Sequence, residues 1–259
     1  DLSHMGPMTR TVSDAALMMN ATAGFDPRDR QSRQEQVDYL AALDNLDLKG
    51  LKAAWSPDLG YANVEPDARN AAEAAAKKLA DLGVEVVEDH PNLGDPWPIV
   101  DALWAPAMAA INADNFEQVR DQLDRGRVAV MESAARFSGV DVSKAHLKRM
   151  AYYDAWREFM ANYDLMLTPT LPIGAFPAGL DQPGQVNGVP THSLSWPAFT
   201  SPSTLTGQPA ATVPCGFDRD GLPLGLQIVG RYGDDATVLR AAAAFEAAAP
   251  WTQLTPPLD

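Results

Sequence analysis

Residues 200–230, TSPSTLTGQPAATVPCGFDRDGLPLGLQIVG, decide the fold of this chain because they combine two apolar segments with a turn between them. The segments are AATVPCGF (210–217) and LPLGLQIVG (222–230). Residues 218–221, DRDG, separate them, and an Asp-Gly pair at this place is typical of a tight turn. The stretch therefore predicts a buried β-hairpin.

Upstream of the hairpin, apolar runs alternate with helical patterns. Residues 51–55 and 84–89 predict strands, and the segment between them predicts a helix that begins at Pro66 and ends at a glycine. Residues 163–172, YDLMLTPTLP, predict a further buried strand that stops at its prolines. A strand, helix, strand order favours parallel pairing in a sheet covered by helices, so the predicted fold class is α/β.

The remaining segments are expected to be helices and loops. Residues 11–23 and 234–250 have helical spacing, and Asp234 and Asp235 stand in the first turn of the second of these, where they favour capping. Residues 96–162 are predicted to be mostly helical. Residues 173–208, rich in Gly, Pro and Ser, are predicted to form one long loop, and loops of that length are usually functional or disordered.

Composition narrows the classes of function. The formal net charge is -14 at pH 7, which disfavours direct contact with nucleic acid or an anionic membrane. Cys215 is the only cysteine, so no intrachain disulfide can form, and we expect a cytoplasmic protein. There is no apolar run of about 18 residues and no pattern of metal ligands, so we expect no membrane span, no metal and no cofactor.

Four stretches agree in order and approximate spacing with one known family. They are GPMTRTVSDAALMMNATAGFDPRD (6–29), YDLMLTPTLP (163–172), TLTGQPAATVPCGF (204–217) and GLPLGLQIVGR (221–231), the last followed by an alanine-rich helix. On these stretches the chain resembles the carboxy-terminal half of an amidase of the amidase signature family. The resemblance covers nearly the whole chain and is weakest between about residues 90 and 160.

The resemblance implies one domain over residues 1–259, built as a mixed β-sheet sandwiched between α-helices and incomplete at its N-terminus. It also implies hydrolysis of amide C–N bonds through a serine acyl-enzyme, with a bridging serine and a lysine general base. In the family these groups precede the segment that begins here at Gly6. The chain has no Ser-Ser pair, and its lysines, at positions 49, 52, 77, 78, 144 and 148, lie in polar or helical-surface patterns.

No catalytic residue can therefore be assigned here, and we expect the chain alone to be inactive, with the triad supplied by an upstream segment. The part of the resemblance that does carry over is a pocket wall. It places Phe199, Thr200 and Thr204 against the substrate, and Trp196 offers flat apolar area beside them. The remaining candidates for the same cavity are Trp104 and Met108, one helical turn apart.

Two alternatives stay open. Besides the amide hydrolase, the chain could belong to the A-type subunit of a tRNA-dependent amidotransferase, or it could be a non-catalytic interaction module that kept the scaffold. The expected partners are a small amide substrate, the upstream segment of the same protein and a second copy in a homodimer. His192 and Ser195 lie close in sequence, but catalytic dyads are made by geometry across a fold, so we do not assign them.

Overall fold

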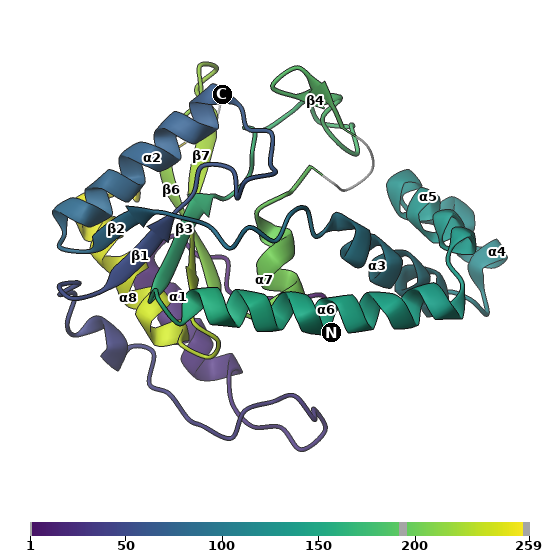
Figure 1. Cartoon of the computed structure of the whole chain (residues 1–259), viewed down its shortest axis with the longest axis horizontal. Coiled ribbons are helices and arrows are strands. Elements are labelled where there is room, and N and C mark those ends of the chain that lie inside the picture. The colour runs from purple at the N-terminus through teal and green to yellow at the C-terminus, as the bar shows by residue number, and fades with distance from the viewer. Residues whose placement is uncertain (1, 192–195, 256–259) are drawn as a thin grey trace.

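The computed structural model describes residues 2–191 and 196–255, which fold around a five-stranded sheet (Figure 1). Its strands, in the order β2-β1-β3-β7-β6 across the sheet, are β1 (Lys52–Trp55), β2 (Glu85–Glu88), β3 (Leu165–Pro169), β6 (Ala210–Phe217) and β7 (Pro223–Gly230). Strand β1 pairs in parallel with β2 and β3, whereas β7 pairs antiparallel with β3 and β6. The sheet is mixed, and the predicted hairpin is confirmed as β6–β7.

Most helices of the described ranges pack around this sheet, whereas α4 and α5 lie away from it (Figure 1). The α-helices are α1 (Val12–Thr22), α2 (Pro66–Asp81), α3 (Trp97–Ile111), α4 (Phe116–Val119), α5 (Arg125–Ser133), α6 (Gly139–Met160), α7 (Thr200–Thr206) and α8 (Asp235–Ala248). Short 3-10 turns are η1 (Ala41–Leu43), η2 (Arg120–Gln122) and η3 (Ala134–Arg136). The helices predicted over residues 11–23, from Pro66 and over residues 234–250 are confirmed as α1, α2 and α8. The predicted cap of the last is also confirmed, since the Asp234 side chain accepts from the Thr237 amide.

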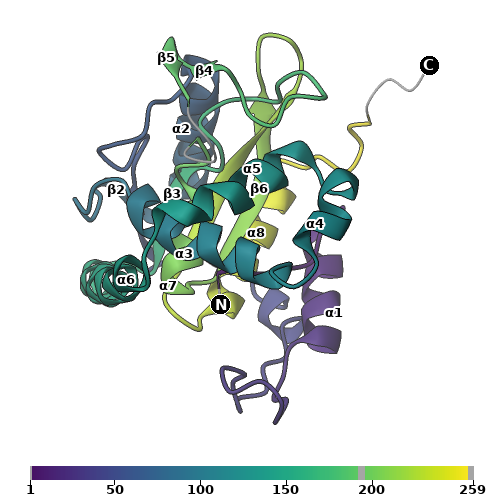
Figure 2. The ribbon, with the colours of Figure 1, turned by 90° about the vertical axis from the view of Figure 1, so that its right-hand side faces the viewer.

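Two apolar layers hold the sheet between helices (Figures 1 and 2). The first layer joins one face of the sheet to α1, α2 and α8, and Leu167, Ile228 and Phe245 are among its buried residues. The second layer joins the other face to α3, α6 and α7, with Met166 and Trp156 among its members. This is the sandwich that the resemblance implied.

The prediction of one long loop over residues 173–208 is wrong. The segment contains the short strands β4 (Gln185–Val186) and β5 (Val189–Pro190), which pair with each other, and the whole of α7. Helix α7 was hidden by its composition, because it contains Pro202. A proline is tolerated there because the first amides of a helix have no acceptor within the helix.

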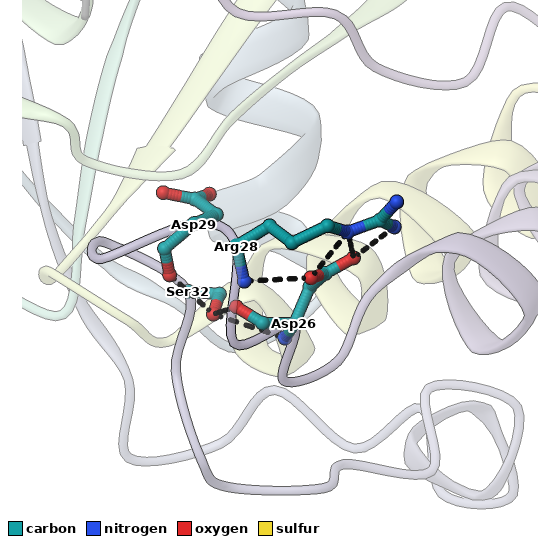
Figure 3. Close-up of polar contacts among 4 residues, drawn as sticks. All are labelled: Asp26, Arg28, Asp29 and Ser32. Atoms are coloured by element: carbon teal, nitrogen blue, oxygen red, sulfur yellow. Dashed lines mark hydrogen bonds and ion pairs between the residues drawn. The ribbon is translucent and has the colours of Figure 1, made fainter.

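The surface connection after α1 is held together by its own side chains (Figure 3). The Ser32 hydroxyl donates to the carbonyls of Asp26 and Asp29 and accepts from the Asp26 amide. Arg28 forms an ion pair with the Asp26 carboxylate at 2.6 Å, and hydrogen bonds from the Arg28 side chain and amide lower the pKa of Asp26. The FDPRD stretch, part of the family resemblance, therefore forms a compact turn.

Candidate functional site

A groove of about 350 Å³ lies between the loop that follows β3, the first turn of α2 and the hairpin β6–β7. Apolar side chains dominate its walls, including those of Leu171, Pro214 and Leu224, and no charged side chain lines it. The rings of Phe176 and Trp196 meet edge to face in its wall, with centroids 5.4 Å apart. Its volume falls at the lower end of the range of small-molecule sites, which begins at roughly 300 Å³.

A row of polar side chains crosses the sheet beside this groove. In the strand register Gln227 of β7 lies between Thr168 of β3 and Thr212 of β6. The Gln227 amide nitrogen is buried and donates to the Thr168 hydroxyl at 3.2 Å and to the Phe199 carbonyl at 2.9 Å. These bonds fix the start of α7 on the sheet, because Phe199 is the residue that precedes this helix.

Two threonines that line the groove meet each other, and one of them, Thr212, is exposed to solvent. The hydroxyls of Thr170 and Thr212 lie 2.6 Å apart, and Gly225 of β7 lies beneath them. A β-carbon at position 225 would stand 2.7 Å from each hydroxyl oxygen, closer than such contacts allow. Glycine at this position is therefore what lets the two hydroxyls meet.

Helix α7 presents the two threonines that the resemblance placed against the substrate. Thr200 and Thr204 are both half-buried, and their spacing of four residues puts them on one face of the helix. The Thr200 hydroxyl donates to the Pro197 carbonyl at 3.1 Å. The helix ends at Gly207, whose positive φ of 74° suits glycine and whose amide donates to the Ser203 carbonyl.

The other predicted pocket residues lie in different surroundings. Trp196 lines the groove. Phe199 is 1% exposed and belongs to the second apolar layer, so its ring packs inside the protein. Trp104 lies on α3, half-buried against the same layer, and Met108 lies one turn further along that helix. Of the six predicted pocket residues, only Trp196 lines the groove.

The titratable groups of the described residues leave the groove without an evident nucleophile. Cys215 is half-buried, and burial raises the pKa of its thiol to about 12. The lysines at positions 49, 77, 78, 144 and 148 are exposed, while Lys52 forms an ion pair with Glu85 at 3.4 Å. Within residues 2–191 and 196–255, no group of three His, Cys, Asp or Glu side chains is placed to hold a metal ion. His192 and Ser195 lie outside those ranges.

Sequence reasoning missed the polar row and the threonine pair. The reason is a β-bulge at Cys215, between the pairs Pro214–Gly225 and Gly216–Leu224. Counting back from the turn without a bulge would pair Thr212 with Ile228 instead of Gln227 and point it to the opposite face. Two signals in the sequence pointed to the bulge, namely a proline and a glycine inside an otherwise apolar strand.

Comparisons with known proteins agree on one family. A family model described as Amidase matches residues 1–239. The acylamidase of Rhodococcus erythropolis is 38% identical over 258 residues, which cover 98% of this chain and 54% of the relative. The A-type subunit of the glutamyl-tRNA(Gln) amidotransferase of Thermosynechococcus vestitus is 31% identical over 99% of this chain and 58% of the relative.

A solved structure supports the same relationship. The structure of a bacterial aryl acylamidase of the amidase signature family superposes with a TM-score of 0.83 and 29% sequence identity. The match covers 98% of this chain and 56% of that one, so the chain spans about half the length of the proteins that it resembles. The chain belongs to the amidase signature family.

Proposed function

We propose that this chain is the C-terminal portion of an amide hydrolase that cleaves carboxylic amide C–N bonds through a serine acyl-enzyme. The Ser-Ser-Lys triad belongs to an upstream segment of the same protein, which is the principal partner of this chain. The observation that carries the proposal is the combination of a family match over residues 1–239 with coverage of only 54% of the acylamidase relative. By itself the chain is inactive, because no buried lysine accompanies a serine in its described part.

In this proposal the chain supplies one wall of the substrate site. Thr200 and Thr204, half-buried on one face of α7, orient polar atoms of the substrate. Trp196 contributes apolar surface from the groove. Phe199 supports the start of α7 from inside the protein. Trp104 and Met108 extend the wall formed by α7 from the neighbouring helix α3, which packs against α7.

The test is the hydrolysis of 4-nitroacetanilide, which releases a coloured aniline. The chain is assayed alone and joined to the part of the Rhodococcus acylamidase that lies outside the aligned region. We expect no release above the buffer blank from the chain alone and steady release from the hybrid. Activity of the chain alone would contradict the upstream triad, and a folded but inactive hybrid would contradict amide hydrolysis. Circular dichroism establishes that both proteins are folded.

A second candidate is the A-type component of a tRNA-dependent amidotransferase, which the 31% identity to the Thermosynechococcus protein favours. Such a component delivers ammonia to a partner and needs access to a tRNA-bound acyl group. The net charge of -14 opposes contact with tRNA. The hybrid discriminates the two, since glutamine-dependent ammonia release without anilide cleavage would favour the amidotransferase. The third candidate, an interaction module, predicts neither activity.

We also propose a cytoplasmic location, in keeping with the single cysteine. In the described part of the chain, no helix is both long and apolar enough to cross a membrane.

A further inference from the structure

We propose that the outer stripe of α6 is an interface at which two copies of this chain pair with their α6 helices antiparallel. The stripe is a row of exposed apolar residues with one charged residue on each side, namely Val140, Leu147, Met150 and Ala151, flanked by Lys144 and Asp154. The inference goes beyond the proposed function, because it concerns how copies of the chain associate. It assigns a surface to the expected homodimer.

Exposure is the first argument. The side chains of Val140, Leu147 and Met150 are 62%, 66% and 64% exposed. Their spacing of seven and three residues puts them on one face, because an α-helix repeats every 3.6 residues. Ala151, four residues after Leu147, is also exposed and extends the same face. Single exposed apolar residues are common on protein surfaces, whereas a contiguous patch of them marks a contact surface.

The opposite face of α6 already has its partners. Ala145, Tyr152 and Trp156 are buried there in the second apolar layer. One apolar face is enough to hold a surface helix on its own protein, yet the outer stripe gives α6 a second one, which stays exposed within residues 2–191 and 196–255. Figure 2 views α6 along its axis, at the margin of the molecule. A partner for the stripe therefore has to come from outside the described part of the chain.

Charge is the argument for a second copy. Lys144 flanks the stripe in the first half of α6, and Asp154 flanks it in the second half. Neither side chain forms an ion pair with another side chain in the described ranges. Position 149 lies midway between them. In an antiparallel pair centred there, each Lys144 faces Asp154 of the second copy, and each Leu147 faces Ala151 of the second copy.

The expected interface is small. Helix α6 has 22 residues and is about 33 Å long at a rise of 1.5 Å per residue. A single pair of helices lies at the low end of interface sizes, where weak complexes are found. We therefore expect a dimer with a dissociation constant between roughly 1 and 100 µM. It should weaken as salt is added, because its ion pairs lie at the rim of the interface.

The test is sedimentation equilibrium of the chain. It is carried out in the Ala210→Lys background, because β6 is at the edge of the sheet and its open edge can also associate. We expect a monomer–dimer equilibrium. Leu147→Lys puts a charge in the apolar centre and should weaken the dimer at least about tenfold. The matched control is Leu17→Lys, which changes an exposed leucine on α1 and should alter the dissociation constant by less than about twofold.

Charge reversal separates this pairing from other modes of association. Lys144→Asp sets two carboxylates against each other on both sides of the symmetric pair and should weaken the dimer about tenfold, and Asp154→Lys should do the same with two ammonium groups. The double variant Lys144→Asp/Asp154→Lys restores opposite charges and should return the dissociation constant to within about threefold of its starting value. Lys78→Asp, on α2, is the control and should have no effect. Circular dichroism establishes that each variant is folded.

Three results would overturn the inference: a monomer at all concentrations up to about 100 µM, a dimer that Leu147→Lys leaves intact, or a double variant no tighter than the single reversals. The upstream segment is the alternative occupant of the stripe. If it lies there, the hybrid with the Rhodococcus part sediments as a monomer while the chain alone dimerises, and the assignment to a second copy is wrong. We expect the hybrid to dimerise and to respond to Leu147→Lys in the same way. Since these measurements report mass, a hybrid that hydrolyses no anilide leaves their outcome unchanged.

Discussion

Gln227 is the residue on which the arrangement of the candidate site depends most. Its buried amide connects the middle of the sheet to the first turn of α7, through the Thr168 hydroxyl and the Phe199 carbonyl. A leucine of similar size would leave that carbonyl without its donor. A buried polar group without a partner costs about 1–3 kcal/mol.

We therefore predict that Gln227→Leu lowers the free energy of unfolding by about 2 kcal/mol, measured by urea denaturation. The matched control is Gln118→Leu, an exposed glutamine, which should stay within about 0.5 kcal/mol of the parent. Equal stability of the two variants would show that the Gln227 bonds do not hold α7.

Cys215 gives a prediction about reactivity. Because burial raises the pKa of its thiol to about 12, the reactive thiolate is scarce at neutral pH. Ellman's reagent at pH 7.5 should react slowly with the folded protein and rapidly after unfolding in urea. Rapid reaction of the folded protein would contradict the burial of this thiol.

The raised pKa of Cys215 also determines how the stability of the fold changes with pH. The folded protein binds the thiol proton more tightly than the unfolded chain does. The thiol therefore adds no pH dependence well below its unfolded pKa of about 8.5, and it lowers stability as the pH rises above that value. The decline between pH 8 and pH 10 should be smaller in Cys215→Ala.

Among the elements, α6 is the longest helix in the described ranges and has the best-defined start. The Ser138 hydroxyl accepts from the Asp141 amide, and the Asp141 carboxylate accepts from the Ser138 amide, which together make a capping box. The Ser138 hydroxyl also donates to the Asp141 carboxylate at 2.6 Å, and this bond, together with the one from the Ser138 amide, lowers the pKa of Asp141. The contribution of this carboxylate to stability is thus present at neutral pH and is lost as the pH falls through the acid range.

We predict that Ser138→Ala costs about 1 kcal/mol of stability, because it removes the acceptor of an otherwise unpaired helix amide. Ser143→Ala, on the same helix, is the control. The Ser143 hydroxyl bonds back to the Gly139 carbonyl within the helix, so its loss should be close to neutral. The two variants are compared by thermal unfolding, monitored by circular dichroism. A control variant as unstable as Ser138→Ala would rule out the cap as the cause.

The elements also show how far sequence reasoning reaches. Strands β1 and β2, helices α2 and α8 and the hairpin carry strong local signals, such as the proline start of α2 and the Asp-Gly turn. Helix α7 has none, since its Pro202 and its Ser and Thr residues are typical of loops, and only its contacts with the sheet make it helical. The groove could not be predicted from the sequence for a related reason: a one-residue bulge decides on which face of the sheet Thr212 lies.

At the scale of the whole molecule, β6 is an edge strand. The Gly230 amide donates to the Pro209 carbonyl, so in antiparallel pairing Ala211 and Val213 bond to β7 while the amides of Ala210 and Thr212 point outward. In the described part of the chain no other backbone group pairs with these outward amides. Unpaired edges of this kind favour association with other strands.

We predict that the chain by itself self-associates as its concentration rises from about 1 to 100 µM, measured by light scattering after size-exclusion chromatography. Ala210→Lys places a charged side chain on the open edge and should shift the protein toward the monomer. The control is Val189→Lys, which changes an exposed residue on the separate strand β5. A chain that remains a 27.8 kDa monomer throughout would contradict association through this edge.

The bulge at Cys215 has a consequence for protein engineering. It divides the hairpin into an outer part, which ends in the turn at residues 218–221, and an inner part, which carries Thr212 and Gly225. The inner part is held by Gln227 and by the apolar layers. Residues inserted in the outer part therefore need not change the strand register of the inner part. An insertion in the turn would accordingly leave the register of the inner part intact and lie at the rim of the groove, because Asp218 lies against Gly174 and Pro223 lines the groove, which makes the turn suited to a fluorescent reporter of groove occupancy.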